Sequence, residues 1–129
     1  MSLCLVSGSL FAALPLTAFT LAWTHSIEKT RWEEDWRISG PALVAIEARI
    51  RGSGAGMEPP PGAELRNGTW HYVPAIPPQK MLRLANSAYA ATYELCIDGA
   101  CHALADLLPG IEDNAEGDAM ITLAPCTNP

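Results

Sequence analysis

Short apolar runs recur along the chain every ten to fifteen residues or so, and Gly, Pro, Asn and Asp separate them. This spacing is typical of a sandwich or barrel in which each run is one strand and each break is a turn. We therefore predict an all-β fold, a single small antiparallel β-sandwich or barrel with at most one short helical turn. The predicted strands cover residues 3–7, 17–26, 32–38, 43–50, 63–66, 69–73, 80–84, 92–97, 100–104 and 119–124.

Two dipeptides predict tight β-hairpins. Asn67-Gly68 and Asp98-Gly99 each supply the residue types that adopt positive φ at both central positions of a type I′ turn. The first turn places Leu65 opposite Trp70. The second lies inside "YELCIDGACHAL", and one helical turn is expected in the "HALADLLPG" that follows.

The segment "SGPALVAIEARIRG" carries signals for both a helix and a strand. A serine and a proline at its start, good helix formers inside and a glycine after it favour a helix. The same residues alternate in polarity, and the neighbouring segments are rich in strand signals. We predict a strand over residues 43–50, with Val44, Ile46, Ala48 and Ile50 on one side and Ala45, Glu47, Arg49 and Arg51 on the other.

The N-terminal region is long and apolar. Before Glu28, the chain has no acidic or basic side chain apart from His25, and a run of this length can cross a bilayer. However, the run has no positively charged start, Ser7-Gly8-Ser9 interrupts it, and Pro15 lies in its middle. We favour two buried strands, "SLCLVSG" and "LTAFTLAWTH", with a turn region between them, over a spanning helix or a signal segment.

The four cysteines are candidates for disulfides. The Asp98-Gly99 turn puts Cys96 directly opposite Cys101, at a non-hydrogen-bonded pair where side chains approach closely. Cys4 and Cys126 lie near opposite ends of the chain, so joining them would close a very long loop. Four cysteines allow three pairings, and four reduced thiols in a cytosolic protein are the alternative.

Composition narrows the class of protein. A length of 129 residues suits one domain with a modest core, so residues 1–129 are predicted to be a single β domain. The content of 49% hydrophobic and 17% charged residues is that of a globular chain. A net charge of −6 argues against nucleic acid as a partner, because phosphate binding needs clustered Lys and Arg.

Polar groups are dense in "WTHSIEKTRWEEDW", which runs from Trp23 to Trp36. We interpret this stretch, called the polar ribbon below, as a surface that recognises a ligand or a partner, because exposed tryptophan beside Arg and Lys is typical of binding hot spots. A solvated ribbon laced with ion pairs is the alternative. If the first part is a strand, Trp23, His25 and Ile27 lie on one face and Thr24, Ser26 and Glu28 lie on the other. In the return strand, one face carries Trp32, Glu34, Trp36 and Ile38.

A second unusual stretch is "GSGAGMEPP". Alternating glycines permit positive φ or the close approach of another group to the backbone. A phosphate-binding loop would continue into a helix with a lysine, whereas Met57, Glu58 and prolines follow here. We expect a ligand or partner contact at this Gly-rich loop, with a tight bend at a barrel corner as the alternative.

The sequence offers little for catalysis or metal binding. It contains no CxxC, HxH or HExxH spacing, and its three histidines lie in separate segments. It also lacks the G-x-S-x-G elbow of hydrolases. Neighbours such as Cys101 and His102 point to opposite faces of a strand and cannot act as a dyad. We assign no catalytic residue, metal or cofactor.

Both stretches, with a closing "LAPC", resemble motifs of an uncharacterised bacterial domain family, over nearly the whole chain. Genes of that family lie beside genes for tripartite (TRAP) solute transporters of the TAXI type. The HSxEKT…EE motif falls at His25, Ser26, Glu28, Lys29, Thr30, Glu33 and Glu34, and the GxGAGMEPP motif falls at Gly52, Gly54, Ala55, Gly56, Met57, Glu58, Pro59 and Pro60.

The resemblance implies an accessory domain of a TAXI-type transporter. Such a domain would bind a small solute or transporter components through the polar ribbon and the Gly-rich loop, at one rim of the fold, and would contact the membrane only through a partner. Exported members of the family favour a periplasmic location, with the cytoplasm as the alternative. The rival hypothesis is a small hydrolase-like enzyme that uses His25 with Glu28 or Glu33 as acid and base.

Overall fold

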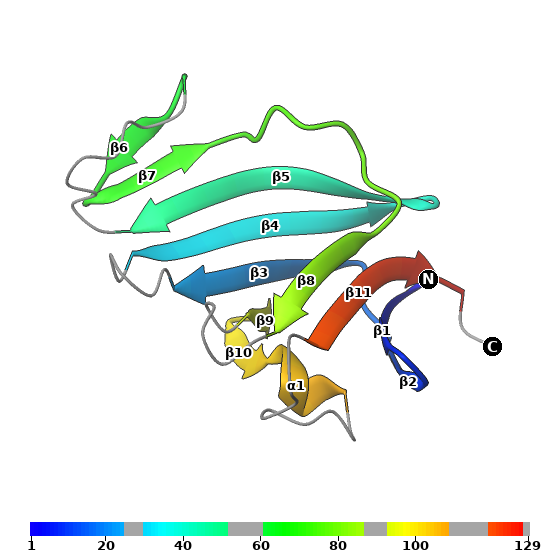
Figure 1. Cartoon of the computed structure of the whole chain (residues 1–129). Coiled ribbons are helices and arrows are strands. Elements are labelled where there is room, and N and C mark those ends of the chain that lie inside the picture. Colours follow the sequence, from blue (N-terminus) through cyan, green and yellow to red (C-terminus); the bar gives the residue numbers. More distant parts are fainter. Residues whose placement is uncertain (25–29, 52–60, 87–92, 109–118, 128–129) are drawn as a thin grey trace.

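The computed structural model describes residues 1–24, 30–51, 61–86, 93–108 and 119–127, which form two antiparallel β-sheets (Figure 1). The small sheet has the strand order β2-β1-β11-β8, with β1 (Ser2–Ser7), β2 (Leu10–Leu14), β8 (Leu82–Asn86) and β11 (Ala119–Cys126). The large sheet has the order β10-β9-β3-β4-β5-β7-β6, with β3 (Ala18–Thr24), β4 (Arg31–Ser39), β5 (Ala42–Arg51), β6 (Glu64–Arg66), β7 (Thr69–Tyr72), β9 (Glu94–Ile97) and β10 (Ala100–Ala103).

The core lies between the two sheets. One face of each sheet supplies apolar side chains, and the short helix α1 (Leu104–Leu107) covers one end of the same core. The prediction of an all-β sandwich with at most one short helical turn is confirmed, and among the described strands neither sheet closes into a barrel. The buried core residues are Leu3, Leu5, Phe19, Leu21, Trp36, Ile38, Leu43, Leu84, Leu95, Leu104, Leu108, Ile121 and Leu123.

The N-terminal apolar run forms strands, as favoured, but it forms three of them. The predicted turn region between two strands was wrong, because β2 pairs with β1 across a two-residue turn at Gly8-Ser9, where Gly8 has φ of 60°. Gly-Ser between apolar runs is itself a hairpin signal. No helix in the described part of the chain is long and apolar enough to cross a membrane.

Both predicted hairpins are present. Asn67 and Asp98 each have φ of 51°, and the glycines after them also have positive φ, as a type I′ turn requires. Leu65 faces Trp70 across the first turn, as predicted.

The β4–β5 hairpin resolves the segment that had both helix and strand signals. A turn at Gly40-Pro41 joins the two strands, so the Ser and Pro mark a turn rather than the start of a helix. The predicted strand is confirmed, but its predicted faces are correct only from Glu47 onward. A β-bulge opposite Asp35 and Trp36 leaves Ile46 without a partner and reverses the alternation before it.

All four cysteines form disulfides, Cys4 with Cys126 and Cys96 with Cys101. The Cys4–Cys126 bond joins β1 to the last residue of β11, with a Cα–Cα distance of 5.9 Å. The Cys96–Cys101 bond crosses the β9–β10 hairpin in the predicted register, with a Cα–Cα distance of 3.9 Å. The disulfide hypothesis is therefore confirmed, and the reduced alternative is not.

Candidate functional site

One end of the large sheet brings together the strand ends that flank both sequence motifs. Strand β3 ends at Thr24, just before the polar ribbon continues, and β5 ends at Arg51, just before the Gly-rich loop. Five strands contribute one residue each to a cross-strand row at this end, which we call the rim row. Its partners in register are Thr24 with Arg31, Arg31 with Arg51, Arg51 with Thr69, and Thr69 with Arg66.

Most of the predicted site residues lie outside the described residues. They are His25, Ser26, Glu28, Lys29, Gly52, Gly54, Gly56, Met57 and Glu58. The strand ends next to them are nevertheless neighbours, because Arg31 pairs with both Thr24 and Arg51. The chain between the two motifs is extended and doubles back as one hairpin. Residues 25–29 join β3 to β4 and residues 52–60 follow β5, and so both motif segments are attached at the same end of the sheet.

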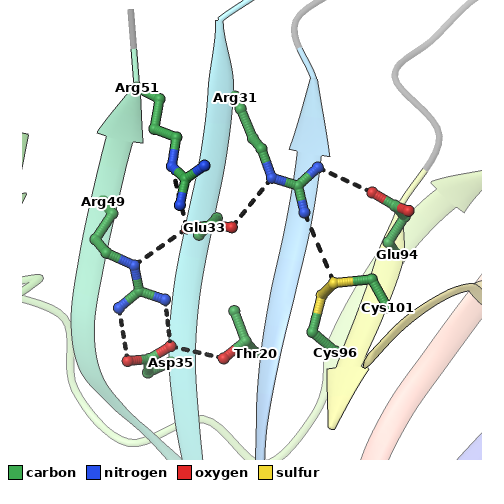
Figure 2. The surroundings of a disulfide bond; sticks show 9 residues. All are labelled: Thr20, Arg31, Glu33, Asp35, Arg49, Arg51, Glu94, Cys96 and Cys101. Carbon is green, nitrogen blue, oxygen red and sulfur yellow. Dashed lines mark hydrogen bonds and ion pairs between the residues drawn. A yellow bond between two sulfur atoms is a disulfide. The ribbon is translucent and has the colours of Figure 1, made fainter. Parts of the chain in front are cut away.

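An ion-pair network covers the face of the large sheet that points away from the small sheet, which we call the outer face (Figure 2). Glu33 is at its centre. Its Oε2 accepts from Arg31 Nε at 3.0 Å, and its Oε1 accepts from Arg49 Nε at 3.1 Å. Burial raises the pKa of Glu33, but the hydrogen bonds from Arg31 and Arg49 and the charges of Arg49 and Arg51 lower it by more, and the net pKa is below its ordinary value.

Arg49 links this centre to three further side chains. Its Nη1 and Nη2 donate to Asp35 Oδ2 and Oδ1, each at 2.8 Å, and Nη1 also lies 3.3 Å from Glu47 Oε1. Glu47 Oε1 is in turn 3.0 Å from His71 Nδ1. The hydrogen bond with Arg49 lowers the pKa of Asp35, and the one with His71 lowers the pKa of Glu47.

Arg31 connects the network to the β9–β10 hairpin. Its Nη1 donates to Glu94 Oε1 at 3.0 Å, and its Nη2 lies 3.8 Å from Cys101 Sγ (Figure 2). The guanidinium groups of Arg31 and Arg49 are thus fully engaged by protein partners, and these two side chains are only 27% and 20% exposed. Their role is to hold the outer face together.

The other arginines of the rim row, Arg51 and Arg66, are exposed. Arg51 is 61% exposed and reaches Glu33 Oε1 only at 4.0 Å. Arg66 is 57% exposed and lies 4.0 Å from the carboxylate of Glu64, which is itself 75% exposed. Ion contacts this long between exposed groups contribute little to the free energy of folding. Both guanidinium groups are available to a partner.

The opposite face of the same sheet end, which faces inward, is aromatic. Trp23 and Trp32 stack with ring centroids 6.0 Å apart, and Tyr93 lies against Trp23 at 5.5 Å. Glu34 lies on this face, where its Oε1 accepts from Trp36 Nε1 at 3.2 Å. Burial raises the pKa of Glu34, and the hydrogen bond from Trp36 offsets only part of that effect.

A family model described as "Domain of unknown function (DUF1850)" matches residues 19–104. The chain belongs to this family. The match spans every strand of the large sheet and both motif segments, whereas β1, β2 and β11 of the small sheet lie outside it. No curated protein and no solved structure matches the chain.

The structure separates several residues that the sequence grouped in this DUF1850 chain. Glu33 and Glu34 lie on opposite faces of β4, so they do not form a carboxylate pair. Trp36 is buried and Trp32 is half-buried, and so Trp36 cannot be an exposed tryptophan of a binding surface. Thr30 is also buried, directly before β4.

The sequence analysis did not identify the basic residues of this candidate site. The strands "RWEED" and "EARIR" carry the opposite charges, but a hairpin closed at Gly40-Pro41 alone would place Glu33 opposite Ala48. The β-bulge at Ile46 shifts the register by one residue, and so Glu33 lies opposite Arg49. The sequence predicts strands over 32–38 and 43–50, but it does not predict this bulge, and so the observed register between them could not be assigned. The missed members of the outer face and the rim row are Arg31, Asp35, Arg49, Arg51, Arg66 and Thr69.

Proposed function

We propose that this DUF1850 protein is an accessory recognition domain of a TAXI-type TRAP transporter and binds a transporter protein through the rim of its large sheet. The observation that supports this proposal best is the pairing of Arg31 with both Thr24 and Arg51. It brings the flanks of the two family motifs to adjacent strand ends. Segments that a family shares and that leave one edge of a fold together are suited to form one binding surface.

Two further observations support the transporter setting. The two motifs resemble those of a family whose genes lie beside genes for TAXI-type transporters. All four cysteines form disulfides, which persist in oxidising compartments such as the bacterial periplasm. A periplasmic domain could meet both the solute-binding protein and the outward-facing surface of the membrane components.

The chemistry of the rim favours a protein over a small solute as the partner. Ionisable side chains extend across the outer face from β9 to β6, next to the rim row, as Glu94, Glu33, Arg49, His71 and Glu64. Broad charged faces give specificity and orientation to protein–protein encounters. Sites for small molecules are instead concave and mostly apolar.

The rival enzyme hypothesis receives no support from Glu33. A general acid or base works best when its pKa lies near the working pH. Arg31 and Arg49 hold the Glu33 carboxylate in its ionised form and lower its pKa, and both of its oxygens already accept hydrogen bonds. Glu33 is therefore suited to anchoring arginines and poorly suited to transferring protons.

The proposal is tested by co-purification of the tagged protein with the TAXI solute-binding protein and the transporter membrane components. We expect the wild type to retain at least one of these proteins. The double variant His25→Ala, Glu28→Ala alters the polar ribbon and should retain about tenfold less. Lys80→Ala, Arg83→Ala alters two exposed residues away from the rim and should behave as wild type. Absence of all transporter proteins from the wild-type sample would contradict the proposal.

A further inference from the structure

The rim row contains three arginines in a chain with a net charge of −6, and among the described residues two of them, Arg51 and Arg66, have no ion partner closer than 4.0 Å. Arg31 directs Nε to Glu33 and Nη1 to Glu94 at 3.0 Å each. Because Arg31 and Arg49 occupy both oxygens of Glu33, Arg51 is left with a 4.0 Å contact to a carboxylate that is already satisfied. The fold therefore leaves Arg51 as an exposed positive charge next to Glu33, a carboxylate that two other arginines already bind.

Arg66 supplies a second exposed charge at the same level of the sheet. Thr69 of β7 pairs with Arg51 on one side and with Arg66 on the other, so all three side chains leave the same face. Adjacent strands are about 4.8 Å apart, which places the two arginine backbones roughly 10 Å from each other. Two long, flexible arginine side chains on either side of a threonine hydroxyl can close on one carboxylate group from both directions.

We propose that Arg51, Thr69 and Arg66 form a carboxylate clamp that docks an acidic segment of a protein partner. Arginine suits this task because its planar guanidinium donates two parallel hydrogen bonds to a carboxylate. A threonine hydroxyl between the two arginines adds a third donor. This inference rests on the proposed function, since it names the surface and the chemistry by which the transporter protein would be held.

The surroundings of the clamp favour an acidic protein segment over a free carboxylate solute. Arg66 and His71 border a hollow of about 220 Å³ whose lining also includes Glu47 and Glu64. A free anion at this position would sit beside two carboxylates of the protein. A protein segment can direct one acidic side chain at the clamp and keep its remaining contacts elsewhere on the sheet.

The test titrates the isotopically labelled protein with a capped hexapeptide that carries one glutamate among serines and glycines, and follows the arginine Nε–H signals by NMR. We expect the Arg51 and Arg66 signals to shift with saturation. Arg51→Gln and Arg66→Gln should each weaken the affinity for the peptide about tenfold. The control is Arg37→Gln. Arg37 is an exposed arginine on the outer face of the large sheet, at the end of β4 away from the clamp, and its loss should leave the affinity unchanged.

Three outcomes would overturn the clamp. The first is a shift that grows without saturation and is matched by NaCl at the same ionic strength. The second is an equal loss of affinity in Arg37→Gln. The third is saturation by acetate at the same carboxylate concentration as the peptide, which would point to a small carboxylate instead of a protein segment.

The same variants separate failure of the clamp from failure of the transporter assignment. Peptide binding that depends on Arg51 and Arg66, together with no recovery of transporter proteins, supports the clamp and contradicts the assignment. Equal recovery of transporter proteins by wild type and by the Arg51→Gln, Arg66→Gln double variant contradicts the clamp and supports the assignment.

Discussion

Arg49 and Asp35 form a bidentate ion pair across β4 and β5, with Nη1–Oδ2 and Nη2–Oδ1 distances of 2.8 Å. They are diagonal neighbours, because Asp35 pairs in register with Glu47 and Arg49 pairs with Glu33. Thr20 on β3 donates to the same Asp35 Oδ1 at 2.7 Å. One guanidinium thus coordinates carboxylates from two strands and fixes the outer face from which the exposed rim arginines project.

Arg49 and Arg51 should differ strongly in their contribution to stability. Arg49→Gln removes the main partner of Asp35 and one of the partners of Glu33 and Glu47, at a side chain that is 20% exposed. We expect a loss of about 1–3 kcal/mol in the free energy of unfolding. Arg51→Gln removes a side chain that is 61% exposed and should change it by less than about 0.5 kcal/mol. Urea denaturation of both variants checks this contrast, and equal losses would show that Arg49 does not organise the network.

Asp35 should make the protein sensitive to acid. Its pKa is lowered from its ordinary value of 3.8 by Arg49, so the fold favours the carboxylate form. The stabilisation is complete above that ordinary value and is lost as pH falls through the lower pKa of the folded state. Asp35→Asn should therefore be less stable than wild type at neutral pH, and the difference should shrink below about pH 4.

Denaturation midpoints measured from neutral to acidic pH test the role of Asp35. The matched control is Asp106→Asn, which changes an exposed aspartate of α1 and should follow the wild-type curve. A difference between Asp35→Asn and wild type that persists undiminished at the lowest pH would indicate a packing effect instead of an ionic one.

Glu34 should show the opposite dependence. Burial raises its pKa above the ordinary value of 4.5, so ionisation of this carboxyl destabilises the folded state. The destabilisation by Glu34 is smallest below the ordinary value of 4.5, and it grows as pH rises from there through the raised pKa of the folded state. Glu34→Gln keeps an acceptor for Trp36 Nε1 and cannot ionise. This variant should gain stability over wild type as pH rises from 4 to neutrality, whereas Glu64→Gln, at a 75% exposed position, should not. Loss of stability in Glu34→Gln at neutral pH would contradict this account.

The two disulfides should contribute unequally. Cys4 and Cys126 are 122 residues apart, and their bond is worth about 5 kcal/mol on the loop-entropy model. Cys96 and Cys101 are five residues apart, for about 2 kcal/mol on the same model. Paired substitutions to alanine, compared by thermal unfolding, check this order.

Mild reductant should also open the Cys96–Cys101 bond first, because Cys101 is exposed while Cys4 is buried. Alkylation at increasing concentrations of reductant, followed by mass mapping, identifies which pair opens. Simultaneous opening of both bonds would contradict the difference in access.

Much of the fold follows from local signals in the sequence. Asn67-Gly68 and Asp98-Gly99 specify two hairpins and their registers, and the second register places Cys96 opposite Cys101. The strand β2 was missed because its five residues are uniformly apolar and have no alternation to read. The bulge at Ile46 is set by long-range pairing with β4, and so no local pattern predicts it.

The candidate site follows from the sequence only in part. The motifs adjoin the end of the sheet where we propose the site, but they omit the arginines that define its charge. The contact between Arg31 and Glu94 spans 63 positions, and the row from Arg51 to Arg66 depends on the pairing of β5 with β7. These relationships arise from sheet order, which a single sequence does not specify.

The most direct test of the account is a site-specific cross-link from the centre of the rim. We would replace Thr69 with p-benzoylphenylalanine, irradiate cells that express the transporter, and identify the adducts by mass spectrometry. The same probe at Arg83, an exposed position on β8 of the small sheet, is the control. We predict an adduct with a TAXI transporter protein from position 69 and none from position 83. The absence of such an adduct from position 69, or equal adducts from both positions, would contradict the account.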